Sequence, residues 1–342
     1  MQRMTRSNQR GQSESVARQD RQTRPTASPA RGVNPSIFAV KMFVLVVLVF
    51  GFEVAIIRMD AAIKLLCQFV VGLLFAHATE LVHQCIHRTA TGSAPVDHTL
   101  GILLGMPSGT SFWHYLWFHF RHHKLTGSFE DIESFGYSYQ LMESPSRRRR
   151  ILGFLWHLSM VSHYLTALKR MLLATAGRLS AKLAADFPDI HPRVAANIQR
   201  DYAIMAVLLA AALLATVAFE TKLFVDLWLV PLLIGWGPSH ALIELPEHFQ
   251  CDKPASDAWL NTRSIQAGRL ARWLTNFNCN HVGHHHNMAV AMEELPRYEQ
   301  TLAEQHPFKH LEPSYPQFYL RFAKFLFTGR FTKNGAGHGS SV

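Results

Sequence analysis

Charged residues are scarce in this chain of 342 residues. Only 17% of its residues are Asp, Glu, Lys or Arg, whereas soluble proteins average about 25%. Acidic residues are fewer than basic ones, 24 against 34, which gives a formal net charge of +10. Because the basic runs flank apolar segments, we interpret them as determinants of membrane topology and of contact with anionic lipid. We therefore expect no binding to nucleic acid, the usual partner of a basic chain.

Cysteine is also rare, and its spacing is uninformative. The chain has four cysteines, and none of them form a CxxC pair. This pattern predicts neither a disulfide framework nor a zinc or iron–sulfur site built from thiolates. The sequence likewise lacks the GxGxxG fingerprint of dinucleotide-binding proteins. Any metal chemistry must therefore use other side chains, and any electrons must come from elsewhere.

Long apolar runs are present. Four of them are about 20 residues long, the length that crosses a bilayer as a helix, and they cover residues 37–57, 61–82, 202–219 and 223–245. Short links at 58–60 and 220–222 join them into two hairpins, and prolines and glycines predict a kink in the last run. We interpret residues 100–118 as re-entrant or interfacial and residues 151–176 as a helix on the membrane surface. The predicted fold class is an all-α integral membrane protein with about four transmembrane helices.

The two ends of the chain differ in composition from the apolar central part. Residues 1–35 read as a disordered basic arm whose Arg-rich composition is also compatible with a targeting segment. Residues 36–312 form the predicted membrane domain, and residues 313–342 an interfacial tail. Arginines precede the first run, and Arg147–Arg150 separate the hairpins. The positive-inside rule then places the N-terminus, the central segment and the C-terminus in the cytoplasm.

Histidines are the most informative residues present. Eight of the 20 fall into three clusters spaced HxxxH, HxxHH and HxxHH, and these spacings put the side chains of each cluster on one helix face. One HxxxH alone carries little weight, but three clusters on the same predicted side of the membrane predict a shared site. Eight imidazoles suit two metal ions, although imidazole binds iron, copper and zinc alike. The members are His83 and His87; His119, His122 and His123; and His281, His284 and His285.

The order of these clusters among paired apolar runs resembles the membrane fatty acid desaturase superfamily. Four further segments resemble motifs of that superfamily: residues 122–131 (HHKLTGSFED), 246–251 (PEHFQC), 261–263 (NTR) and 276–285 (NFNCNHVGHH). The resemblance covers about residues 65 to 300. It implies a cytoplasmic helical cap that holds a non-haem di-iron centre. The implied iron ligands are His83, His87, His119, His122, His123, His248, His281, His284 and His285.

Neighbouring polar residues receive less definite roles from the resemblance. Glu244 lies four residues before His248, so it either binds metal or a metal-bound water, or is a carboxylate at the membrane boundary. Asn276 and Asn280 are expected to hydrogen-bond ligand histidines or water. After His285 the chain departs from the pattern of relatives, and this departure leaves the substrate and the position of the reaction open.

The implied activity is an O2-dependent fatty acid desaturase that introduces a double bond into the acyl chain of a lipid or acyl thioester. The alternative is a related di-iron hydroxylase or ketolase acting on a carotenoid, alkane or sphingolipid. Because the chain lacks its own redox domain, we expect a separate electron donor of the ferredoxin or cytochrome type. A histidine-rich metal transporter is disfavoured, because the clusters lie beyond the ends of the apolar runs instead of within them.

Overall fold

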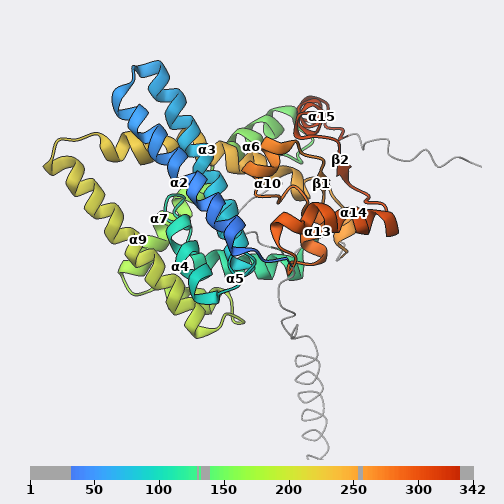
Figure 1. Ribbon diagram of the computed structural model, residues 1–342, viewed down its shortest axis with the longest axis horizontal. Helices are drawn as coiled ribbons and strands as arrows, with labels where there is room; N and C mark the ends of the chain where they lie inside the picture. Colours follow the sequence, from blue (N-terminus) through green and yellow to red (C-terminus); the bar gives the residue numbers. More distant parts are fainter. Residues whose placement is uncertain (1–31, 129–130, 132–138, 253–256, 332–342) are drawn as a thin grey trace, which may run out of the picture.

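The computed structural model describes residues 32–128, 131, 139–252 and 257–331, and helices dominate it (Figure 1). The predicted N-terminal arm lies almost wholly outside the described residues, as does the end of the predicted tail. The first helices are α2 (Pro35–Arg58), α3 (Ala61–Ile86), α4 (Ala94–Gly105), α5 (Phe112–Leu125), α6 (Arg147–Ser159), α7 (Val161–Thr175), α8 (Leu179–Asp186) and α9 (Pro192–Ala218). They are followed by η1 (Val225–Leu229), η2 (Pro231–Trp236), α10 (Gly237–His248), α11 (Ala258–Asn261), α12 (Arg269–Leu274), α13 (His281–His286), η3 (Met292–Glu294), α14 (Leu295–Gln305) and α15 (Tyr315–Thr328).

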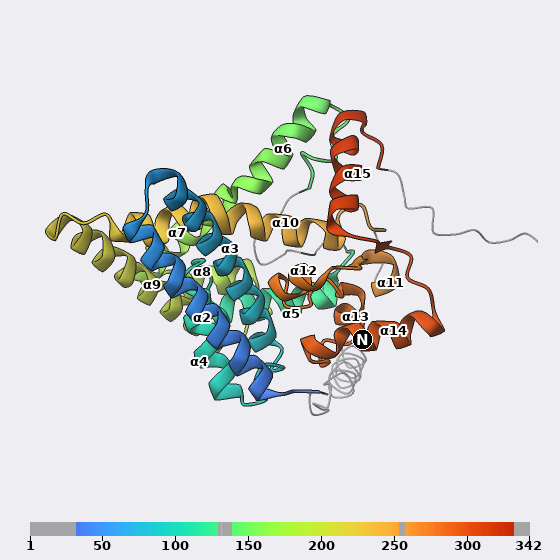
Figure 2. The same ribbon diagram turned by 45° about the horizontal axis from the view of Figure 1, so that its top comes forward.

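The two strands of the described chain are very short. β1 (Ser264–Ile265) pairs in parallel with β2 (Leu311–Glu312), with Ser264 opposite Leu311. The long helices α2, α3 and α9 lie on one side of the molecule and α11 to α15 on the other, with α10 running between them (Figure 2). The prediction of a mostly helical protein is therefore confirmed.

Within the part of the chain that the structure describes, three helices are long and apolar enough to cross a membrane: α2, α3 and α9. Apolar side chains point outward from the first and the last of them, since Phe43 is 70% and Leu214 also 70% exposed. A surface of this kind is suited to lipid. These helices, together with the family described below, make the chain an integral membrane protein. The predicted segment 151–176 forms α6 and α7, which meet at a 46° bend and together pass the same test of length and hydropathy.

The predicted fourth run, residues 223–245, is helical but not regular. It consists of two π-helical turns, η1 and η2, followed by α10. Pro231 begins η2 and Pro238 lies in the first turn of α10, and a proline cannot donate the backbone hydrogen bond of a regular helix. Each of these segments alone is shorter than a span, but the helical backbone continues without a break from residue 223 to residue 248. η2 packs against α3, whereas α9 packs against α5, α7 and α8, so the second hairpin stays a prediction.

α3 is the central helix of the fold. It contacts α2, α4, α5, α10, α12, η1 and η2, and every residue from Leu74 to Ile86 is buried. Its closest neighbour is η2. A Cβ atom at Gly72 would lie 2.2 Å from the carbonyl oxygen of Pro231 and 2.5 Å from the Cα of Gly235. Small residues permit this backbone approach, which is typical of helix pairs in membranes.

Two of the buried basic residues, Lys41 and Arg150, connect separate parts of the fold. Lys41 lies in the first half of α2, and its side chain is buried. Its Nζ donates to Asn276 Oδ1 at 2.6 Å and pairs with Glu293. Arg150 is 3% exposed, and its guanidinium donates to the carbonyl oxygen of Leu326 at 3.0 Å. Both side chains therefore join separate segments of the fold, because a buried cation needs a polar partner.

Candidate metal centre

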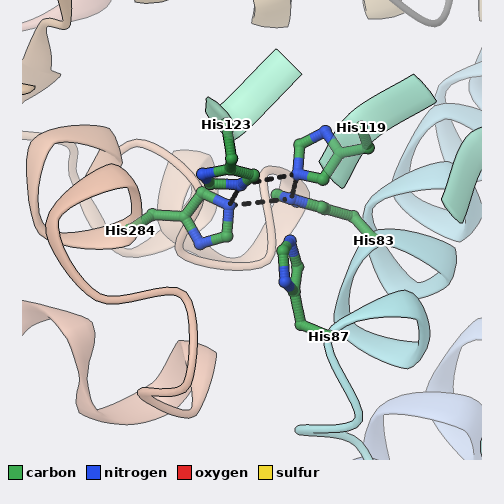
Figure 3. A group of neighbouring side chains, drawn as sticks. All are labelled: His83, His87, His119, His123 and His284. Atoms are coloured by element: carbon green, nitrogen blue, oxygen red, sulfur yellow. Dashed lines mark hydrogen bonds between the residues drawn. The ribbon is translucent and has the colours of Figure 1, made fainter. Parts of the chain in front are cut away.

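Five of the predicted ligands converge in one group (Figure 3). His83 and His87 reach inward from the end of α3, His119 and His123 from α5, and His284 from α13. Their ligand atoms all lie within 4.8 Å of one another. We refer to these five residues as the five-histidine group.

Four Nε2 atoms of this group form a closed ring. The Nε2 of His83 lies 2.8 Å from that of His119 and 3.0 Å from that of His284, and His123 lies 2.9 and 3.0 Å from the same two atoms. The centre of a square with such edges is about 2 Å from each corner, which is the length of a bond between a metal ion and an imidazole nitrogen. The geometry therefore fits a metal ion, and His87 supplies a fifth imidazole beside the ring.

The other four predicted ligands form a second group, the four-histidine group: His122, His248, His281 and His285. The Nε2 of His248 lies 3.2 Å from that of His122 and 3.1 Å from that of His281. The ring of His285 lies beside all three, at centroid distances of 4.6 to 5.0 Å. All nine residues predicted as ligands thus fall into two groups, each with enough nitrogens for one ion.

Both HxxHH clusters divide between the two groups. On α5, His119 and His123 belong to the five-histidine group, whereas His122 belongs to the four-histidine group. On α13, His284 belongs to the first group and His281 and His285 to the second. Because each short helix supplies ligands to both groups, these helices fix the spacing between the two positions. The side chain of Ser111 caps the start of α5 by accepting a hydrogen bond from the backbone N–H of His114.

Hydrogen bonds on the outer nitrogens orient three rings of the four-histidine group. The Nδ1–H of His122 donates to the Asp131 carboxylate at 3.0 Å, and that of His248 donates to the Asn261 carbonyl at 2.9 Å. The Nδ1–H of His281 donates to Asn278 Oδ1 at 2.9 Å. With the proton held on Nδ1, each Nε2 presents its lone pair to the interior, as metal-binding histidines do.

Burial keeps the imidazoles uncharged. It lowers the pKa of His119, His123 and His284 well below the ordinary value of 6.5, and the neighbouring imidazoles lower it further. The same causes act on His281 and His285. Since a protonated imidazole cannot bind a cation, this environment maintains the ligand form of the side chains near neutral pH.

Two predicted partners of the ligands have other roles. Asn276 donates to the backbone carbonyl of Glu80 and to Gln84, while Asn280 donates to Glu299. Asn278, between them, hydrogen-bonds the predicted ligand His281 instead. The reason is local: Asn276 and the following residue have φ angles of 46° and 65°, and this left-handed turn sets which side chain points inward. The alternation of Asn along the segment was visible in the sequence, but the turn was not.

Glu244 does not join the four-histidine group that contains His248, the residue four positions later on α10. Its carboxylate approaches His240 at 3.8 Å, and these two residues form a third cluster with Glu80. Glu247, which was not singled out in the sequence, lies nearer to the histidines: its carboxylate is 3.3 Å from His281 Nε2 and accepts a hydrogen bond from Asn278. Its position next to His248 was the only available signal.

The fold and site together define a class of protein: a helical membrane protein with two adjoining groups of buried histidines. Comparison with protein families agrees, since the model for the fatty acid desaturase family matches residues 60–320. The chain belongs to this family, and the resemblance recognised in its motifs is confirmed. Among curated proteins, none matches the chain. Membership makes the protein a membrane oxidoreductase of a lipid-acting family.

Proposed function

We propose that the protein is an O2-dependent desaturase that introduces a double bond into a fatty acyl chain, with two irons held by the nine histidines. The observation that carries the proposal is the pair of histidine groups, whose Nε2 atoms face inward in a member of the desaturase family. Neutral imidazoles alone would accept several transition metals. The choice of iron rests on the family.

The donor set fits the proposed metals. The five-histidine group would hold one ion and the four-histidine group the other, and both are buried among packed helices. When bound, two irons would supply the dioxygen activation that is needed to remove hydrogen from an unactivated methylene. The protein's own contribution is to hold the ligand rings, keep them neutral and keep water away.

An apolar cavity supports a lipid substrate. It has a volume of about 590 Å³ and lies among α7, α9, η1, η2 and the turn before α5. Its walls include Met171, Met205, Leu209, Trp228 and Leu232. A cavity of this size and lining is suited to an alkyl chain. We also propose that the site faces the cytoplasm and takes electrons from a separate ferredoxin- or cytochrome-type protein.

Lipid profiling of an expressing host tests the proposal directly. The wild-type chain should produce new unsaturated acyl chains in the presence of oxygen, and a His284→Ala chain, present at an equal level in the membrane, should not. New hydroxylated or keto products without unsaturation would instead favour the alternative, a related hydroxylase or ketolase. The purified protein should contain about two irons per chain. Stoichiometric zinc without iron in protein from aerobic cells would contradict the di-iron centre.

A further inference from the structure

A third cluster of metal-binding side chains lies outside the two histidine groups. It consists of Glu80 on α3 and His240 and Glu244 on α10, and one ligand atom from each lies within 4.8 Å of the others. We propose that these three residues form a separate site for a divalent transition-metal ion. This proposal rests on the proposed function in one respect: it assumes that the two histidine groups hold two other metal ions.

The packing of α3 against α10 brings the three side chains close together. His240 and Glu244 are four residues apart on α10, so they occupy one face of that helix, and this face meets α3, which α10 contacts. The ring of His240 stacks on Trp236 at a centroid distance of 5.3 Å, which restricts its orientation. Glu80 is 1% and His240 0% exposed, whereas the side chain of Glu244 is 12% exposed. The cluster is thus buried, with its most accessible member at Glu244.

The separations suit a bridging ion better than direct hydrogen bonds. The carboxylate of Glu80 lies 3.9 Å from His240 Nδ1, and that of Glu244 lies 3.8 Å from His240 Nε2. Both distances exceed the range of a hydrogen bond. Each is shorter than twice a metal–ligand bond of about 2.1 Å, so an ion can lie between His240 and either carboxylate. A single ion binds only one nitrogen of the ring, and one nitrogen of His240 lies within 4.8 Å of one oxygen from each carboxylate.

Charge balance favours a cation over water in that position. Both oxygens of Glu80 are buried, and neither accepts a hydrogen bond of full geometric quality among the described residues; the side chain of Asn278 makes a weaker polar contact with this carboxylate. The ion-pair neighbours of this carboxylate are two imidazoles, those of His240 and of His83, the latter at 3.9 Å. A buried carboxylate without a compensating charge is strongly unfavourable, and a divalent ion would supply that charge. The alternative to a third ion is that an ion bound in the five-histidine group, next to His83, compensates the charge of Glu80 from a greater distance.

The ligand types indicate which ions fit. Carboxylates suit hard ions such as Mn²⁺, and imidazole suits Zn²⁺ or Fe²⁺, so the mixed set of one imidazole and two carboxylates selects the divalent transition metals. Three protein ligands leave at least one position open. An ion here would also tie α3 to α10, the helices that carry His83 and His248.

Zinc stoichiometry tests the third site. Full-length protein in detergent is stripped with a chelator and reloaded with Zn²⁺ as the sole metal, and bound zinc is measured by mass spectrometry. Wild type should bind about three ions per chain, and Glu80→Gln and Glu244→Gln about two each. Glu304→Gln, which changes an exposed carboxylate on α14, should retain about three.

The other outcomes separate this proposal from the proposed function. Wild type that saturates at two ions, or carboxylate variants that retain the wild-type number, would overturn the third site. So would loss of every ion in both variants, because the carboxylates would then serve the histidine groups. If the histidine groups hold no metal, wild type should bind a single ion that Glu244→Gln removes and His284→Ala does not. In that case the third site stands and the di-metal centre fails.

Discussion

The side chain of Glu299 occupies the space in which a side chain at Gly283 would lie. A Cβ atom at Gly283 would be 2.6 Å from Glu299 Cγ. From this position Glu299 accepts hydrogen bonds from the Gly283 N–H at 2.8 Å, from Ser264 Oγ at 2.5 Å and from Asn280 Nδ2 at 2.7 Å. The Ser264 hydroxyl in turn accepts from the Val282 N–H at 2.9 Å. Together Glu299 and Ser264 satisfy two N–H groups at the start of α13, the helix that carries three of the proposed ligands.

Replacing Gly283 by Ala should therefore disturb the metal site through α13. Overpacking of this kind costs about 1–3 kcal/mol, so we expect a lower midpoint of thermal unfolding in detergent and lower metal content. Gly51→Ala is the control: a Cβ there meets nothing within 4 Å, and Ala favours a helix interior by up to about 1 kcal/mol. Equal behaviour of the two variants would contradict a packed contact between Gly283 and Glu299.

The division of the histidines into two groups predicts that substitutions of neighbouring histidines on α13 remove different metal ions. His284→Ala should remove the ion of the five-histidine group, and His281→Ala that of the four-histidine group, so each variant should lose about one equivalent of metal and both should lose oxidation. His286→Ala is the matched control, because His286 is exposed and its Nδ1 bonds Tyr298 Oη at 2.6 Å. Metal analysis of purified variants decides the matter. Simultaneous loss of both ions in either ligand variant would show that the two positions are not independent.

The sequence predicted the nine-histidine set, but not its division into two groups. Spacing of three and four residues places His119, His122 and His123 on one broad face of a helix, and only the packing of α3, α10 and α13 around that face decides which ring meets which partner. The long apolar helices were predicted for a similar reason: hydropathy is a local property. The start of α9 at Pro192 was missed by ten residues because its first turns are polar, although proline in the first turn is a helix-start signal.

The outer hydrogen bond of His281 predicts a role for Asn278 in metal affinity. Asn278→Ala removes the acceptor for the Nδ1–H of His281 and the donor to Glu247. Loss of such a partner typically reduces metal affinity by about 10- to 100-fold. Competition with a chromophoric chelator measures the change, and Asn197→Ala on α9 is the control. Unchanged affinity in Asn278→Ala would show that the packing of α13 alone orients His281.

The contact between α3 and η2 predicts a strong effect at Gly72. A Cβ there would approach backbone atoms of Pro231 and Gly235 at 2.2 and 2.5 Å, and backbone cannot move aside as a flexible side chain can. Gly72→Ala should therefore separate α3 from η2 and destabilise the fold by at least about 1–3 kcal/mol. The unfolding midpoint in detergent, compared with that of Gly51→Ala, gives the test. A midpoint equal to that of the control would mean that the two helices do not pack this closely.

Acid should destabilise the metal-free protein. The pKa values of His119, His123 and His284 are lowered well below 6.5, mainly by burial, so between the folded pKa and 6.5 the unfolded state binds more protons than the folded state. The free energy of unfolding then rises with pH in this window: the stability is fully present above about pH 6.5 and is lost as the pH falls toward the folded pKa. Thermal unfolding of chelator-treated protein across this range measures the slope. His123→Gln, which removes one buried imidazole, should flatten the slope, whereas His286→Ala should leave it unchanged. A midpoint that rises on acidification would mean that the histidine groups are not buried in neutral form.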